Sequence, residues 1–360
     1  MEFDALHKEL AELTAVDAPV GFEEPMLRLV RDRLAPLVDS VEVDVRGNVY
    51  GIKESNAPAA PRVLVLAHVD EIGFLVTGIT PQGFLRFTKL GGPTDHVLPG
   101  QPVRVLAAGT KRDGTIGARP AHVLSGEEAR RVPPPDRLYI DVGATSADEV
   151  AHWGIEPGTP VVYRGPLTAT ANPRRVFGKA MDNRAGVLAM LKAAERLRGE
   201  SIAPTVIWCA PVEEEVGLRG AAVAAAKVQP DVVLAVDTVP AGGTPDLSGD
   251  ELPWQIGKGP LLKVREVKGL STHRPLRELV RRFADRHGLP YQWIVDTAGV
   301  TDATAAQQAG AGIAAMVLGL GRRYSHSAVE MLDLADVQAM IDLLVVTLPE
   351  LDDLSKLLRI

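Results

Sequence analysis

Cysteine is almost absent from this 360-residue chain, whose single thiol, Cys209, excludes an internal disulfide. A chain without disulfides is typical of a reducing compartment, so we expect a cytoplasmic protein. The chain also lacks an apolar stretch of about 18 residues that could span a bilayer. Its first segment, Met1–Leu13, is acidic and amphipathic rather than a signal peptide. These absences predict a protein without a membrane partner.

A surplus of positive charge is missing as well. Acidic residues outnumber basic ones by 46 to 39, which gives a formal net charge of −7. Proteins that bind nucleic acids through phosphate contacts carry the opposite surplus, so we expect no nucleic-acid partner. Hydrophobic residues make up 46% of the chain, which is enough for one large globular domain or two smaller ones.

Strand and helix patterns alternate in two separate parts of the chain. Runs such as Arg62–Ala67 and Thr205–Ala210 are almost entirely apolar, as expected for strands in a sheet that is covered on both faces. Helical patterns such as Asn183–Arg198 lie between runs of this kind. This alternation predicts an α/β fold with a mainly parallel, covered sheet.

Short strands separated by glycine and proline turns dominate the middle of the chain. Such turns are expected at Thr80-Pro81-Gln82-Gly83 and at Arg112-Asp113-Gly114. The pattern is typical of a small β-rich barrel or sandwich. We predict that residues 72–164 form this β-rich domain, inserted into a discontinuous α/β domain of residues 1–71 and 165–360.

Histidine and carboxylate side chains recur where the predicted strands end. Each has an ordinary explanation by itself, such as a helix start or a hydrogen-bonded structural histidine. Their coincidence is informative, because ligand sites in open α/β sheets lie at the carboxyl ends of strands. Imidazole and carboxylate groups together suit zinc or a similar divalent ion. The candidates are His68, Asp70, Asp182, Glu213, Glu214, Glu215, Asp237 and His326.

Two divalent ions that share one carboxylate can support hydrolysis. They bind a water, lower its pKa toward about 7 and polarise a substrate carbonyl. A further carboxylate that binds no ion can take the proton of that water and pass it to the leaving amine. Glu214 and Glu215 could divide these tasks, because successive side chains point in different directions.

Four segments occur in an order and spacing that resemble one known family. They are Ala67-His68-Val69-Asp70-Glu71, Lys179-Ala180-Met181-Asp182-Asn183-Arg184, Glu214-Glu215-Val216-Gly217-Leu218-Arg219-Gly220 and Arg323-Tyr324-Ser325-His326-Ser327. Together they resemble the tetrahedral aminopeptidases, a family of dinuclear metallopeptidases that includes glutamyl and deblocking aminopeptidases. The resemblance implies a phosphorylase/hydrolase-like aminopeptidase domain whose β-rich insert serves dimerisation.

The resemblance also implies two ion sites that share one carboxylate. One site would consist of His68, Asp182 and Asp237. The other would consist of Asp182, Glu215 and His326, so that Asp182 bridges the two ions.

Other roles follow from the same resemblance. Glu214 would be the general base, and Asp70 would orient His68. Glu213 stands where the family often has an uncharged residue, and we assign it no catalytic role. A cis peptide bond between Asp182 and Asn183 is expected as well.

The expected function is that of a metal-dependent aminopeptidase that removes N-terminal residues from peptides. Zinc or cobalt, and also manganese, would suit its sites, and the resemblance implies a homo-oligomer, a tetrahedral dodecamer built from dimers. Two alternatives are a related hydrolase of N-acyl amino acids and a non-catalytic scaffold. Departures from the family pattern at Val300, Gly321 and Ala328 are expected to concern substrate specificity rather than catalysis.

Overall fold

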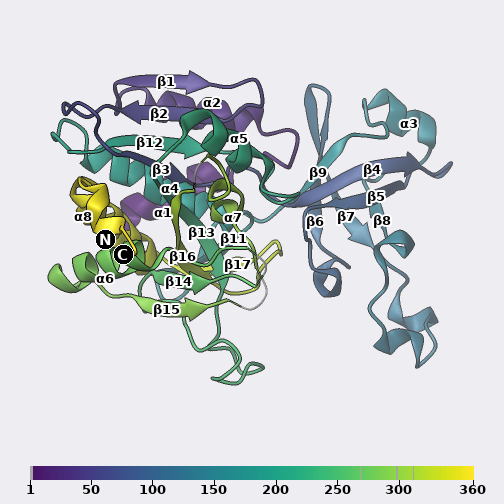
Figure 1. Ribbon diagram of the computed structural model, residues 1–360. Coiled ribbons are helices and arrows are strands. Elements are labelled where there is room, and N and C mark those ends of the chain that lie inside the picture. Colours follow the sequence, from purple (N-terminus) through teal and green to yellow (C-terminus); the bar gives the residue numbers. More distant parts are fainter. Residues whose placement is uncertain (1–2, 268, 297–298, 311) are drawn as a thin grey trace.

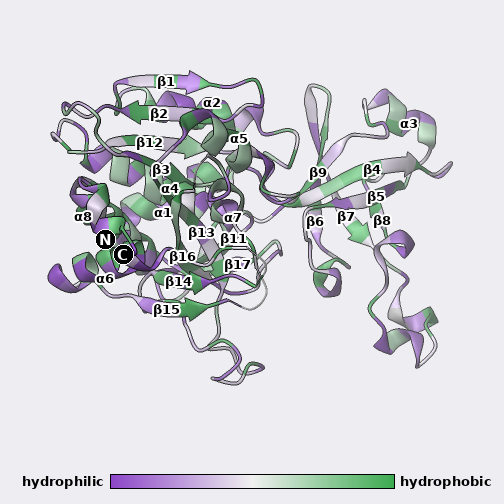
Figure 2. Cartoon of the chain, viewed as in Figure 1, coloured by the Kyte–Doolittle hydropathy of each residue, from purple (hydrophilic) through white to green (hydrophobic). Residues whose placement is uncertain are grey.

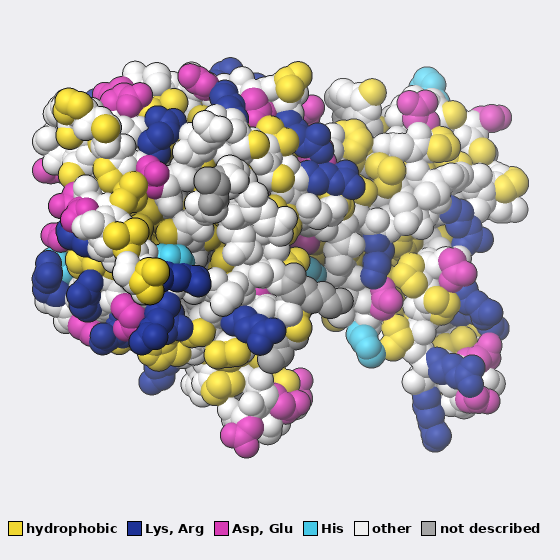
Figure 3. Space-filling view, viewed as in Figure 1, with side chains coloured by type: hydrophobic (Ala, Val, Ile, Leu, Met, Phe, Trp, Pro, Cys, Tyr) yellow, Lys and Arg dark blue, Asp and Glu magenta, His cyan; other side chains and the backbone are white. Residues whose placement is uncertain are grey.

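The computed structural model describes residues 3–267, 269–296, 299–310 and 312–360. Figure 1 shows a large lobe, in which helices surround a sheet, and a smaller lobe of β-strands beside it. On the face drawn in Figure 3, acidic and basic side chains are interspersed over both lobes. Within the described ranges, no helix is long and apolar enough to cross a membrane.

An eight-stranded sheet forms the centre of the large lobe. In order across the sheet, its strands are β1 (Ser40–Val43), β2 (Val49–Lys53), β12 (Thr205–Ala210), β3 (Arg62–Leu66), β13 (Val232–Pro240), β16 (Ala314–Arg322), β14 (Leu261–Arg265) and β15 (Gln292–Val295). The neighbours β12, β3, β13 and β16 run parallel to one another, and β14 runs parallel to β15. The pairs β1–β2, β2–β12 and β14–β16 are antiparallel. The predicted α/β class with a mainly parallel sheet is confirmed.

Helices cover both faces of this sheet. Alternate residues of its strands point to opposite faces, so each face has a hydrophobic core of its own. In β3, Val63 and Val65 belong to one hydrophobic core, whereas Leu64 and Leu66 belong to another. The first core is covered by α1 (Asp4–Thr14), α2 (Glu24–Leu34), α4 (Met181–Arg196), α6 (Arg274–Arg286) and α8 (Leu334–Thr347). The second is covered by α5 (Arg219–Val228) and α7 (Asp302–Ala306). Figure 2 shows the hydrophobic colouring of β3 in the interior of the lobe.

The smaller lobe is a closed six-stranded barrel. Around the barrel, the strands are β4 (Gly73–Ile79), β5 (Leu85–Leu90), β8 (Tyr139–Asp141), β7 (Thr110–Gly117), β6 (Pro102–Ala107) and β9 (Pro160–Tyr163), and a short helix, α3 (Ala147–His152), precedes β9. Its core contains Phe74, whose ring packs edge-on against Phe87 and Tyr163 with centroid distances of 5.2 Å. The barrel lies between β3 and α4 in the chain and is the β-rich element that the sequence predicts.

One predicted turn in this lobe is wrong. Arg112-Asp113-Gly114 lies within β7, and the chain turns instead at Gly109, which has a φ of +74°. Asp113 pairs with Arg104 across the β6–β7 ladder. A Cβ on Gly114 would lie only 2.6 Å from the carbonyl oxygen of Asp141 in β8, so glycine serves close strand packing there rather than a turn.

The sequence pattern does not predict a small antiparallel sheet that lies near the junction of the lobes. It consists of β10 (Thr168–Ala169), β11 (Arg175–Gly178) and β17 (Glu330–Asp333). Its strands are too short to produce a clear alternating pattern. The sheet is nevertheless important, because β11 leads into α4 and β17 begins just after His326.

Candidate metal centre

The carboxyl ends of neighbouring strands bring the candidate side chains to one place. His68 and Asp70 follow β3, Glu214 and Glu215 follow β12, Asp182 lies in the first turn of α4, Asp237 lies within β13, and His326 follows β16. Asp237 was expected just beyond its strand. It lies inside because β13 continues to Pro240, paired with β16 along its whole length.

His68 is at the centre of a first group of side chains. Its Nε2 atom is 3.1 Å from Asp182 Oδ1, 3.7 Å from Asp237 Oδ1 and 3.9 Å from Glu214 Oε2. One ligand atom from each of His68, Glu214 and Asp237 lies within 4.8 Å of the others. This spacing could hold a metal ion.

Asp182, Glu215 and His326 form a second group within the same limit of 4.8 Å. The Nε2 atom of His326 is 3.5 Å from Asp182 Oδ2 and 3.6 Å from Glu215 Oε1. Asp182 therefore directs Oδ1 toward His68 of the first group and Oδ2 toward His326 of the second. It lies between the two groups, where a shared ligand would have to be.

Burial makes the negative charge of these groups unfavourable unless a cation offsets it. Burial, assisted by the charge of Asp182, raises the pKa of Glu215 to about 8, and burial also raises the pKa of Glu214 well above its ordinary value. Burial opposes protonation of His68, but the surrounding carboxylates, Glu214 foremost, outweigh it and raise the pKa of His68. Glu215 Oε1 is buried and has no hydrogen-bond partner in the described part of the chain. These nitrogen and oxygen donors fit divalent ions.

Asp70 supports both groups. Its Oδ1 atom lies 3.4 Å from His68 Nδ1. Its two carboxylate oxygens also accept hydrogen bonds of 3.0 Å from the backbone N–H groups of Glu214 and Glu215. One side chain therefore lies beside the His68 ring and holds the backbone at the start of the segment that follows β12.

Two further residues hold the second group, and sequence reasoning missed both. Arg322 Nη2 lies 2.6 Å from Asp182 Oδ2, and the same guanidinium contacts the carboxylate of Glu330. Glu330 also accepts hydrogen bonds from the backbone N–H groups of Asp182, at 3.2 Å, and His326, at 2.7 Å. Arg322 could have been found as a charged residue at the end of an apolar strand. The sequence around Glu330 has no comparable pattern that would mark it as a functional residue.

Glu213 does not join either group. Glu213 has a φ of +55°, and its Oε2 atom lies 2.8 Å from Arg46 Nη2 and 3.3 Å from Arg219 Nη1. These two ion pairs direct the carboxylate away from the centre. They account for the charge of Glu213 without a catalytic role.

The peptide bond between Asp182 and Asn183 is cis, which confirms the prediction from the resemblance. The Asn183 side chain donates a hydrogen bond of 2.7 Å to the carbonyl of Val236 and accepts one of 3.0 Å from the N–H of Gly186. Asn183 thus ties the first turn of α4 to β13, next to Asp237.

A cavity of about 410 Å³ opens beside the candidate ligands. Its wall includes Lys263 and Asp296, whose Nζ and Oδ2 atoms are 3.1 Å apart, and the aliphatic side chain of Val300. Of the three departures from the family pattern, Val300 lines this cavity. Ala328 packs into the barrel core instead, and Gly321 lies within β16 against Ala241 and Ile256.

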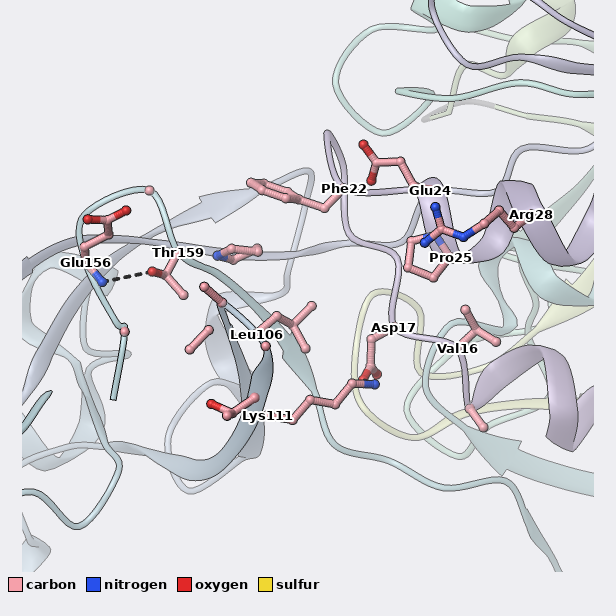
Figure 4. Close-up of a pocket in the computed structure, with 18 residues that line it drawn as sticks. Val16, Asp17, Phe22, Glu24, Pro25, Arg28, Leu106, Lys111, Glu156 and Thr159 are labelled. Atoms are coloured by element: carbon pink, nitrogen blue, oxygen red, sulfur yellow. Dashed lines mark hydrogen bonds and ion pairs between the residues drawn. The ribbon is translucent and has the colours of Figure 1, made fainter. Parts of the chain in front are cut away.

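A larger cavity, of about 1080 Å³, lies elsewhere between the two lobes and contains none of the candidate ligands. Figure 4 shows Phe22 and Arg28 on one side of it and Leu106 and Lys111 on the other. An ion pair joins the two lobes beside it, because the buried Asp17 carboxylate of the large lobe lies 2.7 Å from Lys111 Nζ in the barrel. This cavity therefore marks the contact between the lobes rather than the metal centre.

The sequence and the fold of this chain are similar to those of known aminopeptidases. Residues 47–343 fit the model of the M42 glutamyl aminopeptidase family. The lysyl aminopeptidase of Pyrococcus furiosus is 33% identical over 350 residues, which cover 96% of this chain and 96% of that protein. A solved TET aminopeptidase from the marine sediment archaeon Thaumarchaeota archaeon SCGC AB-539-E09 has 33% identity and a TM-score of 0.94, and the match covers 99% of both chains. The Pyrococcus horikoshii TET1 peptidase, which can assemble into a tetrahedron or a large octahedral shell, has 31% identity and a TM-score of 0.84 over 95% of this chain and 99% of that one.

Proposed function

This chain belongs to the M42 glutamyl aminopeptidase family and is a metal-dependent aminopeptidase, and we propose that it holds two divalent ions. We also propose that Glu214, although it belongs to the first group, is the general base rather than a ligand. The similarity to aminopeptidases extends over nearly the whole chain. It favours this function over the two alternatives, a hydrolase of N-acyl amino acids and a non-catalytic scaffold.

We assign His68 and Asp237 to one ion, Glu215 and His326 to the other, and Asp182 to both. The position of Asp182 carries this assignment, because its two oxygens lie 3.1 Å and 3.5 Å from the Nε2 atoms of the two histidines. Zinc or cobalt suits such donors, and manganese would also be accepted. When bound, the ions would lower the pKa of a water toward about 7 and polarise the peptide carbonyl.

Glu214 is the residue that moves the proton. Its carboxylate lines the cavity beside both groups, and its backbone N–H donates to Asp70, which fixes its position. In the proposed reaction, Glu214 takes a proton from the attacking water and passes it to the nitrogen of the leaving amine as the C–N bond breaks. Asp70 meanwhile keeps the His68 ring oriented through Nδ1.

The exchange Glu214→Gln tests this role. We expect kcat to fall by about 10²- to 10⁴-fold while two ions per chain stay bound, because the Glu214 carboxylate is not a proposed ligand. Glu213→Gln is the matched control, since it makes the same change one residue away, where the carboxylate pairs with Arg46 and Arg219. It should keep the wild-type kcat. Full activity of Glu214→Gln, or the loss of an ion from it, would contradict the assignment.

We further propose that residues 72–164 are the dimerisation domain and that residues 1–71 and 165–360 form the catalytic domain. The assembly of the P. horikoshii TET1 peptidase into a tetrahedron or a large octahedral shell, and a dodecamer of PhTET1 in another solved structure, support a homo-oligomer, for which we propose a dodecamer built from dimers. A hollow assembly of this kind would admit peptides and exclude folded proteins. The single, buried Cys209 is consistent with a cytoplasmic protein.

A further inference from the structure

A short segment of the barrel reaches into the candidate metal centre. It consists of Gly91-Gly92-Pro93-Thr94, directly follows β5, and is called the strap below. Its Gly92 carbonyl oxygen lies 2.9 Å from His326 Nδ1. The N–H of Thr94 donates to the carbonyl of His326 at 3.1 Å, and its hydroxyl donates to the carbonyl of Ser325 at 3.3 Å. The strap therefore holds both the ring and the backbone of His326.

The two glycines of the strap permit this close approach. A Cβ on Gly92 would lie 2.9 Å from His326 Nδ1, and one on Gly91 would lie 3.1 Å from Glu215 Cβ and 3.2 Å from Glu215 Oε2. Real Cβ atoms essentially never come as near as 2.9 Å to another heavy atom. The strap thus packs against two of the three residues of the second group, Glu215 and His326.

The contact with Gly92 decides which nitrogen of His326 is available to a cation. A carbonyl oxygen can only accept a hydrogen bond, so the Nδ1 atom that faces it carries the hydrogen. The lone pair is then on Nε2, the atom that lies 3.5 Å from Asp182 and 3.6 Å from Glu215. Hydrogen bonds of this kind fix the tautomer and the orientation of metal-binding histidines.

We propose that the strap is a positioning element through which the inserted barrel completes the second ion site. The proposal rests on the two-ion function proposed above and assigns Gly91, Gly92 and Thr94 a part in it. Among the described residues, no hydrogen bond or ion pair joins the strap to His68 or Asp237. A change in the strap should therefore weaken the second ion and spare the first.

The variant Gly92→Ala isolates this contact. The φ of Gly92 lies outside the left-handed region, so the new Cβ meets the ring of His326 without straining its own backbone. Gly78→Ala is the matched control, because Gly78 is also a barrel glycine outside the left-handed region, and a Cβ there meets nothing within 4 Å. Thr94→Val is a milder second variant that removes the hydroxyl bond to Ser325 and keeps the backbone bond to His326.

The experiment titrates metal-free protein with Co²⁺ and follows heat and visible absorption. For Gly92→Ala we expect the Kd of the second ion to rise by about 10- to 100-fold, with the first Kd unchanged. Thr94→Val should show a smaller rise, and Gly78→Ala none. Activity of Gly92→Ala should be low at limiting Co²⁺ and recover at high Co²⁺ while the first Kd stays at the wild-type value, a combination that a general folding defect would not produce.

Two results would overturn the proposal. Both ions could bind Gly92→Ala and Thr94→Val as tightly as they bind the wild type, or both sites could weaken equally. A wild-type chain that binds fewer than two ions would instead refute the proposed function itself, so the two failures are distinguishable.

Discussion

The exchange Glu330→Gln should weaken both the fold and the second ion site. Glu330 is buried, with 2% of its surface exposed, and its carboxylate receives three donors: the backbone N–H groups of Asp182 and His326 and the guanidinium of Arg322. Glutamine has nearly the same shape, but only one of its two terminal atoms accepts hydrogen bonds. Its NH₂ group would therefore face at least one of these donors.

The size of the effect follows from these contacts. Removing one partner of a buried ion pair costs about 3–5 kcal/mol. Arg322 keeps its other partner, Asp182, at 2.6 Å, and burial raises the pKa of Glu330, so the ionised carboxylate is itself partly unfavourable. We therefore expect a loss at or just below the lower end of this range, about 2–3 kcal/mol in the free energy of unfolding.

Urea unfolding of the metal-free protein measures this loss. Wild type and variant must be compared at one protein concentration, because oligomerisation shifts apparent stability. Glu195→Gln is a suitable control, since its carboxylate pairs with Lys192 on the surface and is 54% exposed, and it should change stability by less than about 0.5 kcal/mol. If Glu330→Gln were as stable as this control and bound the second ion as tightly as the wild type, Glu330 would not support the site as described.

Two further predictions concern pH and assembly. Burial raises the pKa of Glu23 from 4.5 to about 7, so the folded chain holds a proton that the unfolded chain has released, and stability should fall as the pH rises through this window. The side chain of Glu23→Gln can still accept the hydrogen bond from the Gly21 N–H but does not titrate. The variant should therefore lose this pH dependence of the free energy of unfolding, measured with urea, and be up to about 3 kcal/mol more stable than the wild type above pH 7. An unchanged pH dependence would contradict the assignment to Glu23. For assembly, sedimentation equilibrium should give about twelve times the chain mass of 38.4 kDa, whereas a monomer would rule out the proposed oligomer and a dimer would rule out the dodecamer.

The sheet and the positions of the candidate ligands could be predicted from local sequence. Apolar runs such as Arg62–Leu66 and Thr205–Ala210 form adjacent parallel strands, and polar residues after such strands must meet at one edge. His68, Glu214 and Glu215 are therefore brought together because the strands before them pair. Asp237 shows the limit of this reasoning, since the length of β13 depends on its neighbour β16 rather than on its own pattern.

Apart from Asp70, the residues that hold these ligands could not be predicted in the same way. Glu330 contacts a residue 148 positions away, and Gly92 contacts one 234 positions away. Neither contact follows from periodicity, because both depend on how the barrel and the small sheet pack against the large lobe. The error at Gly114 has the same origin: glycine there serves close packing between strands, which in sequence looks identical to a turn.

The charges at the centre favour two ions over one. Asp182, Glu214, Glu215 and Asp237 carry four negative charges when ionised, and none of these side chains is more than 10% exposed. Arg322 adds no net charge, because Glu330 shares it. One divalent ion would offset only two of these four charges, whereas two ions would offset all four. In the ion-free chain, burial and the charge of Asp182 raise the pKa of Glu215 to about 8, so a proton and a metal ion compete for the carboxylate that the strap packs against.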